Sequence, residues 1–329
     1  MKKVFYLYKS GELQRKDFSL LLQEKNGNVV YIPVEQINLI VCFGDVNLNK
    51  RVLGLLNSYS VSILFFNYYG DYIGRFTPKK YSDGKIIINQ VNSYHNHKRL
   101  YIAKKMIFTE MKNILSLLKY YNKKYHLLEQ MIINVDNELN KLDTIESIEE
   151  LLLLEAIIKK QYYSSFDYII KNPNFIFKNR SFYPPLNEVN ALLSYGYAIL
   201  YANVLSDIDK SPLLPQISYI HSLSKQSDSL QFDIADMLKP IFIDRLILRM
   251  INKNQIKTNY FEYKENGACY LNKEGIKVFL YEYEKLMQKS IKIGGKYYSY
   301  RNIITREVYK LSNYIEGKTD EYKPYIMEW

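Results

Sequence analysis

The sequence predicts an α+β protein in which a small N-terminal β-sheet domain, residues 1–90, precedes a larger all-α domain, residues 91–329. Two patterns support this fold class. Short apolar runs separated by turn residues fill the first part of the chain, and from about Tyr94 the apolar residues recur with the 3.6-residue period of helices. The length of 329 residues also exceeds the roughly 250–300 residues that a single hydrophobic core usually holds. We therefore expect two domains with segregated secondary structure.

The predicted strands are runs of apolar and aromatic residues that end at turn signals. In chain order they are Val4–Tyr8, Phe18–Leu22, Val29–Pro33, Ile37–Phe43, Val61–Phe66 and Tyr72–Phe76. Asn26–Gly27 predicts a hairpin turn between the second and third strands, and residues 67–71 connect the last two. One helix, predicted over Val46–Tyr59, interrupts this rhythm because apolar residues there recur at helical spacing. We expect the β region to end near residues 85–90.

The helices of the second domain are predicted from amphipathic periodicity. The first carries an apolar stripe of Ile102, Met106, Met111, Ile114, Leu115 and Leu118, with lysine and asparagine opposite. Further helices are predicted over Lys124–Lys141, Ser147–Ile170, Leu186–Leu205, Leu230–Asn252, Lys273–Gln288 and Asn302–Ile315. The two glycines of Ile293–Lys296 predict a turn.

The charge balance narrows the class of partner. Lys and Arg number 45 against 34 Asp and Glu, which gives a formal net charge of +11 and a pI of about 9.2. An excess of this size favours a polyanionic partner, and nucleic acid is the commonest one. The 33 tyrosines and the abundant Lys, Ile and Asn also suggest an AT-rich genome, whose codon bias by itself enriches lysine.

Several functional classes lack their signature in this sequence. Cys42 and Cys269 are far apart, which excludes a disulfide-stapled scaffold and a cysteine-based zinc site. No Walker loop, dinucleotide fingerprint or Gly-x-Ser-x-Gly motif is present. The N-terminus lacks the apolar core of a signal peptide, and no stretch reaches the roughly 18 apolar residues of a membrane span. We expect a soluble, cytoplasmic protein without a membrane partner.

Acidic residues inside apolar helical stretches are the first candidates for chemistry. Glu155 lies between Leu151–Leu154 and Ala156–Ile158. A carboxylate in that setting is costly to bury unless it is paired or bound to a cation. The alternative is a helix-surface glutamate that forms an i,i+4 ion pair with Lys159.

Two aspartates form a second candidate site. Asp233 and Asp236 are spaced i,i+3 on a predicted helix, so their side chains are neighbours on one face, with Cβ atoms about 5–6 Å apart. A divalent cation would relieve their mutual repulsion. Basic side chains would do the same, and Lys239 and Arg245 are near in sequence. The spacing favours neither alternative over the other.

Histidines add conditional candidates. His221 follows the Pro-bounded segment Pro215–Ile220, where a lone histidine is more often a hydrogen-bonded structural residue. Combined with two or three carboxylates, its neutral imidazole would suit Mn²⁺ or Mg²⁺. His95 and His97 could also hold a metal, but no acids lie close in sequence, and a polar interdomain linker is expected there.

Basic residues with interleaved tyrosines are typical of proteins that follow a phosphate backbone. They are Lys79-Lys80, Lys98-Arg99, Lys104-Lys105, Lys123-Lys124, Lys159-Lys160, Arg180, Arg245 and Arg249.

Several segments, in order along nearly the whole chain, carry a family resemblance. They are Tyr6–Tyr8 with Gly11 and Leu13, Ile32–Ile37, Asn67–Gly74, Leu154-Glu155-Ala156 with Tyr162-Tyr163, Arg180–Tyr197, Leu214–His221, and Ser229–Asp236 with Lys239-Pro240. Together they resemble the Cas1 family, the CRISPR-associated endonuclease/integrase of spacer acquisition, and their placement suggests a type I system. Ser218 stands where many members have Gly, and Lys239 where many have Arg.

The resemblance implies a function and a site. Glu155, His221 and Asp236 would ligate a divalent metal, Mg²⁺ or Mn²⁺, with Asp233 as an auxiliary acid on the same face. The enzyme would insert short foreign DNA fragments, as spacers, into a CRISPR array. In that reaction the 3′-hydroxyl of a captured double-stranded fragment attacks a phosphodiester of the CRISPR repeat.

The resemblance also implies partners. They are a second copy of the chain, joined through the β domains as a homodimer, and a small ferredoxin-like second Cas protein of the adaptation complex. Two alternatives stay open at this point. One is a structure-selective, metal-dependent DNA nuclease that acts by hydrolysis only. The other is a basic DNA-binding scaffold whose acids merely pair with lysines.

Overall fold

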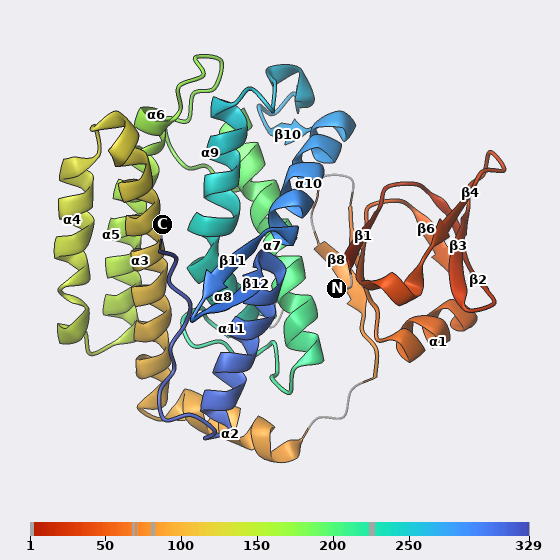
Figure 1. The fold of residues 1–329 in the computed structure, drawn as a ribbon, viewed down its shortest axis with the longest axis horizontal. Helices are drawn as coiled ribbons and strands as arrows, with labels where there is room; N and C mark the ends of the chain where they lie inside the picture. The colour runs from red at the N-terminus through yellow and green to blue at the C-terminus, as the bar shows by residue number, and fades with distance from the viewer. Residues whose placement is uncertain (1–2, 68–69, 71, 80–82, 224–227, 329) are drawn as a thin grey trace. The chain divides into compact units, whose positions relative to one another are not determined.

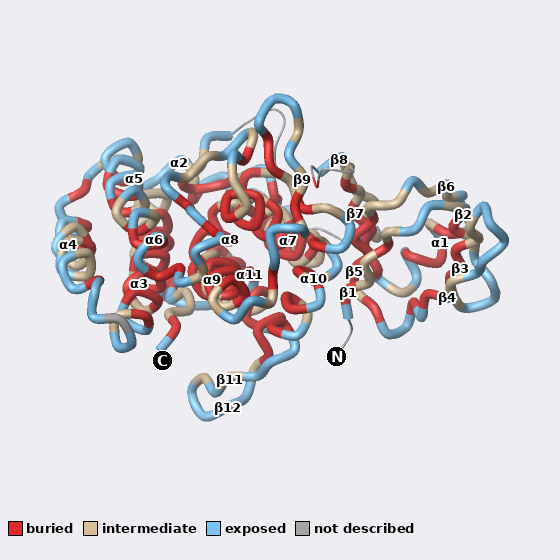
Figure 2. Tube along the Cα trace, turned by 90° about the horizontal axis from the view of Figure 1, so that it is seen from above, coloured by how far each residue is buried: buried red, intermediate tan, exposed pale blue. Residues whose placement is uncertain are grey.

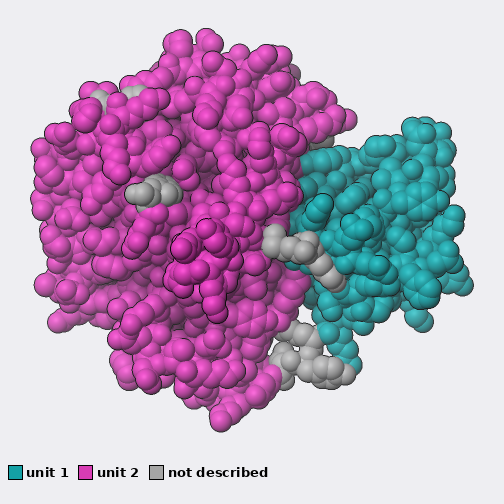
Figure 3. Space-filling model, viewed as in Figure 1, with its two compact units in different colours: residues 1–82 teal, residues 83–329 magenta. Residues whose placement is uncertain are grey.

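The computed structural model describes residues 3–67, 70, 72–79, 83–223 and 228–328. Lys80 and parts of the predicted 67–71 connection lie outside the described residues. The chain divides into two compact units, Met1–Ser82 and Asp83–Trp329, which are coloured separately in Figure 3. The predicted domain boundary after residue 90 falls inside helix α2 (Gly84–His95), the first element of the second unit.

The first unit contains two four-stranded mixed sheets (Figure 1). One sheet has the order β1 (Lys3–Leu7), β5 (Ile37–Cys42), β7 (Ser62–Phe66) and β8 (Tyr72–Phe76). Its first three strands are parallel and β8 is antiparallel to β7. The other sheet has the order β4 (Val29–Ile32), β3 (Ser19–Gln23), β2 (Gly11–Lys16) and β6 (Val46–Leu48).

Both sheets and helix α1 (Lys50–Tyr59) contribute to one core in this unit, which includes Leu22, Ile40 and Leu56. Each of the six predicted strands is present to within two residues. Strand β2 was not predicted, because Leu13 is its one fully buried apolar side chain and its neighbours are polar.

The helix predicted over Val46–Tyr59 is shorter than expected, and its first residues form strand β6 instead. The helix begins at Lys50 because Asn49 caps it. The Asn49 Oδ1 accepts hydrogen bonds from the backbone N–H groups of Arg51, at 3.0 Å, and Val52, at 3.3 Å. Leu48 in β6 lies four residues before Val52 and so continues the helical period, which is why periodicity alone placed the start too early.

The second unit is mostly helical, as the sequence predicts. Its α-helices are α2, α3 (Lys98–Tyr125), α4 (Glu129–Leu139), α5 (Ile148–Ser164), α6 (Phe166–Ile169), α7 (Glu188–Lys210), α8 (Leu230–Lys239), α9 (Arg245–Asn252), α10 (Lys273–Gln288) and α11 (Tyr300–Ile315). Two short hairpins accompany them. They are β9 (Phe261–Tyr263) with β10 (Cys269–Leu271), and β11 (Ser290–Ile293) with β12 (Lys296–Ser299), joined at the predicted Gly294–Gly295 turn.

Helix packing within this unit positions three helices that carry acidic residues. Helix α8 packs against both α3 and α7, and α5 also packs against α3. Helix α7 is buried along most of its length (Figure 2). Helices α5 and α8 therefore both lie against α3. None of the described helices is long and apolar enough to cross a membrane.

The single helix predicted over Leu230–Asn252 is interrupted by a π-helical turn, η3 (Pro240–Asp244). Pro240 has no N–H to donate to the carbonyl four residues before it, so the regular bonding pattern cannot continue there. Instead the N–H of Arg245 donates to the carbonyl of Pro240, five residues back. The wider turn separates α8, which carries Asp236, from α9.

We predict that Gly196→Ala destabilises the second unit by about 1–3 kcal/mol through overpacking. A Cβ at this position on α7 would lie 2.6 Å from Ile243 Cγ2 and 3.0 Å from Phe279 Cζ. Denaturant unfolding followed by circular dichroism measures the effect. Gly54→Ala is the matched control, since a Cβ there meets nothing within 4 Å and should stabilise the exposed helix by about 0.5–1 kcal/mol. Unchanged stability of Gly196→Ala would contradict the close packing of α7.

Candidate metal centre

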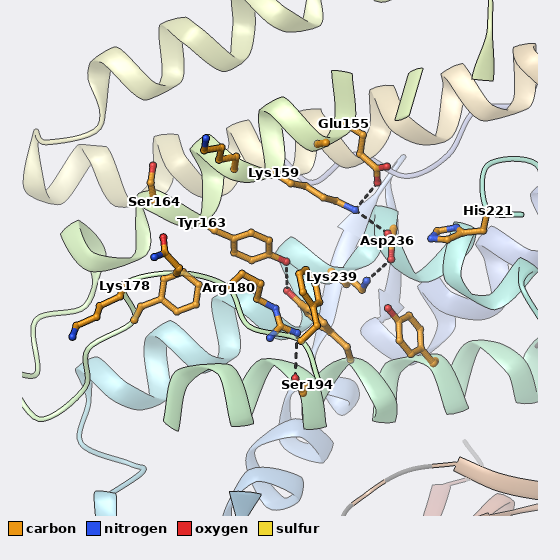
Figure 4. A pocket seen from close by; sticks show the side chains of 17 residues that line it. Glu155, Lys159, Tyr163, Ser164, Lys178, Arg180, Ser194, His221, Asp236 and Lys239 are labelled. Carbon is orange, nitrogen blue, oxygen red and sulfur yellow. Dashed lines mark hydrogen bonds and ion pairs between the residues drawn. The ribbon is translucent and has the colours of Figure 1, made fainter. Parts of the chain in front are cut away.

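A pocket of about 800 Å³ opens among the helices of the second unit. Its walls come from α5, from residues 177–182, from α7 and from α8, with His221 at one side (Figure 4). Glu155 and Asp236, two of the residues that the sequence singled out, lie together in this pocket with Lys159 and Lys239.

Three carboxylates converge where α3, α5 and α8 meet, and two of them, Glu155 and Asp236, line this pocket. Glu155 on α5, Asp236 on α8 and Glu110 on α3 each offer an oxygen atom, and these atoms lie within 4.8 Å of one another. The residues are 9%, 5% and 3% exposed, respectively. Three mutually repelling carboxylates at this degree of burial need positive charge close by.

Lys159 supplies part of that charge. Its Nζ lies 2.5 Å from Glu155 Oε1, 2.9 Å from Asp236 Oδ2 and 3.1 Å from Glu110 Oε1, so one ammonium contacts all three carboxylates. Burial alone would lower the pKa of Lys159, but Asp236, Glu110 and Glu155 hold it well above its usual value. The lysine is therefore a firmly charged counter-ion.

Lys239 supplies the second positive charge. Its Nζ forms an ion pair with Asp236 Oδ1 and lies 4.5 Å and 4.8 Å from the ring centroids of Tyr197 and Tyr201. Burial would raise the pKa of Asp236, yet Lys159 and Lys239 together hold it below its usual value. Asp236 is therefore an anion across the physiological range.

Glu110 differs from its two neighbours. Burial raises its pKa well above the usual value, against the attraction of Lys159. Its Oε1 contacts Lys159, while its Oε2 is buried and has no hydrogen-bond partner. An unpartnered carboxylate oxygen is costly in a protein interior, so Glu110 Oε2 is an acceptor in the cluster whose hydrogen-bonding capacity is unsatisfied.

Asp233 has a different environment from Asp236. It is fully buried, and its carboxylate accepts the backbone N–H groups of Tyr219, at 2.6 Å, Ile220, at 3.1 Å, and His221, at 3.1 Å. It also contacts His221 Nδ1 at 2.7 Å. Asp233 thus anchors the segment that carries His221 and fixes the orientation of the imidazole.

His221 lines the same pocket, and its ring nitrogen Nδ1 is engaged by Asp233, which leaves Nε2 for the pocket. Burial would lower the pKa of His221, but the hydrogen bond and charge of Asp233 raise it above the usual value. Among the described residues, the third member of the tight acidic group is Glu110, and His221 lies outside that group.

The sequence predictions for these residues have mixed outcomes. The i,i+4 pair of Glu155 with Lys159 is present, as is an ion pair of Asp236 with Lys239. Arg245 does not join them, since its guanidinium lies over the ring of Tyr120, 5.0 Å from the centroid. The carboxylate of Asp233 accepts hydrogen bonds from backbone N–H groups and is not part of the acidic cluster, although Asp233 lies on the same helix as Asp236.

Glu110 was missed, although the sequence carries a signal for it. It lies four residues after Met106 and four before Ile114, on the apolar stripe of α3 rather than on the lysine-rich face. A glutamate on a buried helical face is the same kind of signal that identified Glu155.

The residues present fit a divalent cation. Carboxylate oxygens are the ligands that Mg²⁺ and Mn²⁺ prefer, and an imidazole nitrogen is compatible with Mn²⁺. Three carboxylates converge here, the orphaned Oε2 of Glu110 lacks a partner, and an ammonium already lies at the point where they meet.

Basic and aromatic side chains form the opposite wall of the pocket. The Arg180 guanidinium donates to Asn190 Oδ1 at 2.9 Å and to Ser194 Oγ at 3.2 Å, and it lies 4.5 Å from the ring centroid of Phe182. Of the predicted basic track, Lys159, Lys160 and Arg180 line this pocket. Arg249 does not, since it pairs with Glu282 on α10 at 2.9 Å.

A buried tyrosine–carboxylate network adjoins the pocket. Asp244, in the π-helical turn, accepts hydrogen bonds of 2.7 Å from the hydroxyls of Tyr162 and Tyr197. Tyr197 also hydrogen-bonds the hydroxyl of Tyr163 at 3.0 Å. Burial raises the pKa of Asp244 to about 6, despite the two tyrosine hydrogen bonds.

Comparison with known proteins identifies relatives over the full chain. The family model described as CRISPR associated protein Cas1 matches residues 5–285. The CRISPR-associated endonuclease Cas1 2 of Thermodesulfovibrio yellowstonii is 36% identical over 333 residues, covering 100% of both chains. A solved Cas1 protein from Thermotoga maritima is similar with a TM-score of 0.86 and 31% identity, over 99% of this chain and 100% of that one.

Two more distant structures share the fold. A casposase bound to an integration product has a TM-score of 0.89 at 20% identity, over 100% of this chain and 95% of that one. A Cas6-RT-Cas1–Cas2 complex has a TM-score of 0.85 at 17% identity, over 100% of this chain and 36% of the matched one. The fold prediction is thereby confirmed, whereas no finding bears on the predicted type I system.

We predict that Asp244 makes stability fall as pH rises. Its folded pKa, about 6, lies above its ordinary value of 3.8, so the folded state binds this proton more tightly. The resulting stabilisation is complete below the unfolded pKa and is lost as pH rises through the folded one.

The advantage of the wild type over Asp244→Asn should therefore be larger at pH 5 than at pH 7, by about 1 kcal/mol. Urea unfolding of both proteins at the two pH values measures this difference. The other carboxylates are the same in both proteins, so their contributions to the pH dependence cancel. An advantage that shrinks on acidification would show that Asp244 is an ordinary, ionised aspartate.

Proposed function

This chain belongs to the Cas1 family of CRISPR-associated proteins, and from that premise we propose that it is a metal-dependent DNA endonuclease/integrase. It inserts short foreign DNA fragments, as spacers, into a CRISPR array. The observation that carries the proposal is the convergence of Glu155, Asp236 and Glu110, two of which, Glu155 and Asp236, line a pocket with basic and aromatic side chains.

The proposed reaction is a transesterification. The 3′-hydroxyl oxygen of a captured fragment bonds to a phosphorus atom of the CRISPR repeat, and the bond from that phosphorus to the repeat's own 3′-oxygen breaks. The leaving oxygen takes up a proton, so the number of phosphodiester bonds is unchanged. A divalent ion, Mg²⁺ or Mn²⁺, held by Glu155, Asp236 and His221, would lower the pKa of the attacking hydroxyl and stabilise negative charge in the transition state.

The chain's own residues have separate tasks in this proposal. His221, oriented by Asp233 through Nδ1, presents Nε2 to the pocket, where it can hold a proton or ligate the ion. Lys239 and Arg180 provide positive charge for the phosphates of the two strands and orient the in-line attack. Lys239 does so as a point charge, since lysine lacks the bidentate fork of arginine.

We extend the proposal to the assembly. The substrates are double-stranded DNA, namely the captured fragment and the CRISPR repeat, and the net charge of +11 supports such a partner. The chain acts as a homodimer through its N-terminal unit, together with a small second Cas protein. A Cas2 partner is named for one structure that shares this fold.

A nuclease that acts only by hydrolysis is the second candidate, because relatives such as that of Thermodesulfovibrio yellowstonii are named endonucleases. It would use the same carboxylates with water as the nucleophile. The DNA-binding scaffold is the third candidate, since both Glu155 and Asp236 do pair with lysines. The reaction products and the metal dependence distinguish the three.

We predict that Glu155→Ala and Asp236→Ala each lower strand transfer about a hundredfold or more, because even partners outside a metal's ligand shell cost about 10–100-fold. The assay joins a labelled short duplex to a supercoiled plasmid that carries a repeat, with Mn²⁺ and the second Cas protein present. Wild type should transfer label only when the metal is present.

Glu149→Ala is the matched control. Glu149 lies on the same helix α5 but is exposed, so its loss should leave strand transfer near the wild-type rate. Nicked plasmid without joined label would support the hydrolytic nuclease. Strand transfer that survives Glu155→Ala and chelation of the metal would refute the metal centre and leave the scaffold role.

A further inference from the structure

We propose that Lys159 is an internal occupant of the cation site, that a divalent ion binds by displacing its ammonium, and that Glu110 is a fourth ligand-bearing residue of the centre. This inference rests on the proposed function, because it concerns how the same site takes up its metal. It assigns roles to two residues, Lys159 and Glu110, that the sequence-based ligand set does not contain.

The first argument is the position of the ammonium. Lys159 Nζ contacts one oxygen from each of the three carboxylates, at 2.5, 2.9 and 3.1 Å. An ammonium has three N–H donors, so these contacts use its full donor capacity. A cation held by Glu155 and Asp236 would need the same oxygens that now face Lys159 (Figure 4).

The second argument is the charge balance. Glu110 must be ionised to act as a metal ligand, and in that state the three carboxylates with the ammoniums of Lys159 and Lys239 carry one net negative charge. A divalent ion added to this set would leave one net positive charge in a buried site. Departure of Lys159 from the cluster restores neutrality, and burying uncompensated charge is costly. Exchange is therefore favoured over simple addition.

The third argument is that Lys159 has somewhere to go. Its side chain is 25% exposed, whereas those of Glu110, Glu155 and Asp236 are 4%, 11% and 7% exposed. Lys159 also lines the pocket of about 800 Å³. Its ammonium can thus swing into the pocket by side-chain rotation alone, with helix α5 intact, and there it adds positive charge where DNA phosphates are proposed to lie.

The fourth argument concerns Glu110. Its Oε2 is buried without a hydrogen-bond partner, and its Oε1 loses its contact when Lys159 leaves. A divalent ion satisfies such oxygens, because Mg²⁺ and Mn²⁺ take carboxylate ligands. Glu110 comes from α3, so it would tie the metal to a third helix besides α5 and α8.

Titration of the purified full-length chain with Mn²⁺ alone, followed by calorimetry and by thermal unfolding, tests the proposal without any activity measurement. Lys159→Met keeps the chain length of the side chain and removes its charge. It should bind Mn²⁺ about tenfold more tightly than the wild type, because the competing charge is gone. Its melting temperature should be lower than wild type in chelator and should rise more on adding Mn²⁺.

Lys160→Met is the matched control, since the neighbouring Lys160 is exposed and carries the same charge. Its Mn²⁺ affinity should stay near the wild-type value. Glu110→Gln should bind Mn²⁺ about tenfold more weakly. A merely structural Lys159 predicts the opposite sign, because a disordered cluster would bind the ion less well.

The outcomes separate this inference from the function on which it rests. Mn²⁺ binding by the wild type with unchanged or weaker binding by Lys159→Met would overturn the exchange and leave the proposed function standing. Unchanged affinity in Glu110→Gln would overturn the role of Glu110. No Mn²⁺ binding by any variant, Lys159→Met included, would overturn the metal-dependent function itself, and the exchange with it.

Discussion

The structure of the second unit depends on one electrostatic constraint, which is that three carboxylates must share a buried site. Glu110, Glu155 and Asp236 come from three helices and are each at most 9% exposed. Like charges this close and this buried are costly unless positive charge compensates them. Lys159 meets this requirement by contacting all three residues, and Lys239 neutralises Asp236 from the other side. The packing of the three helices brings the carboxylates together, and the two lysines make that arrangement tolerable.

The surrounding elements keep the cluster at a pocket rather than in a closed core. Asp233 binds three consecutive backbone N–H groups and so fixes the segment that brings His221 to the pocket. The π-helical turn after α8 ends the helix at Pro240 and places Asp244 under the tyrosines of α5 and α7. These groups fix the geometry around the carboxylates by hydrogen bonds, while Glu155 and Asp236 line the pocket.

Much of this could be predicted from the sequence, and the reasons differ by residue. Glu155 and Asp236 were identifiable because a charged residue inside an apolar helical run costs free energy to bury unless a cation or an ion-pair partner compensates it. Glu110 obeys the same rule, but the apolar residues around it on α3 define the stripe by themselves, and periodicity draws no attention to a single acid within it. The separation of Asp233 from Asp236 was not predictable, because i,i+3 spacing fixes only Cβ proximity. The carboxylate orientations depend on partners from other parts of the chain, such as the backbone at 219–221.

The sequence allows two interpretations of these acids, an ion-pair cluster and a metal site. Both meet the same physical requirement, which is positive charge beside buried carboxylates. A carboxylate cluster that binds a divalent ion must also remain folded before the ion arrives, and removing one partner of a buried charge pair is strongly destabilising. An i,i+4 lysine on the same helix as a ligand is a simple way to supply that charge, and Lys159 stands in this position relative to Glu155. The ion pair is therefore compatible with a metal site.

Two features distinguish a metal site from a purely structural cluster. They are an oxygen that the lysine leaves unpartnered, at Glu110 Oε2, and a pocket that would allow the ammonium to leave. A purely structural cluster would need neither.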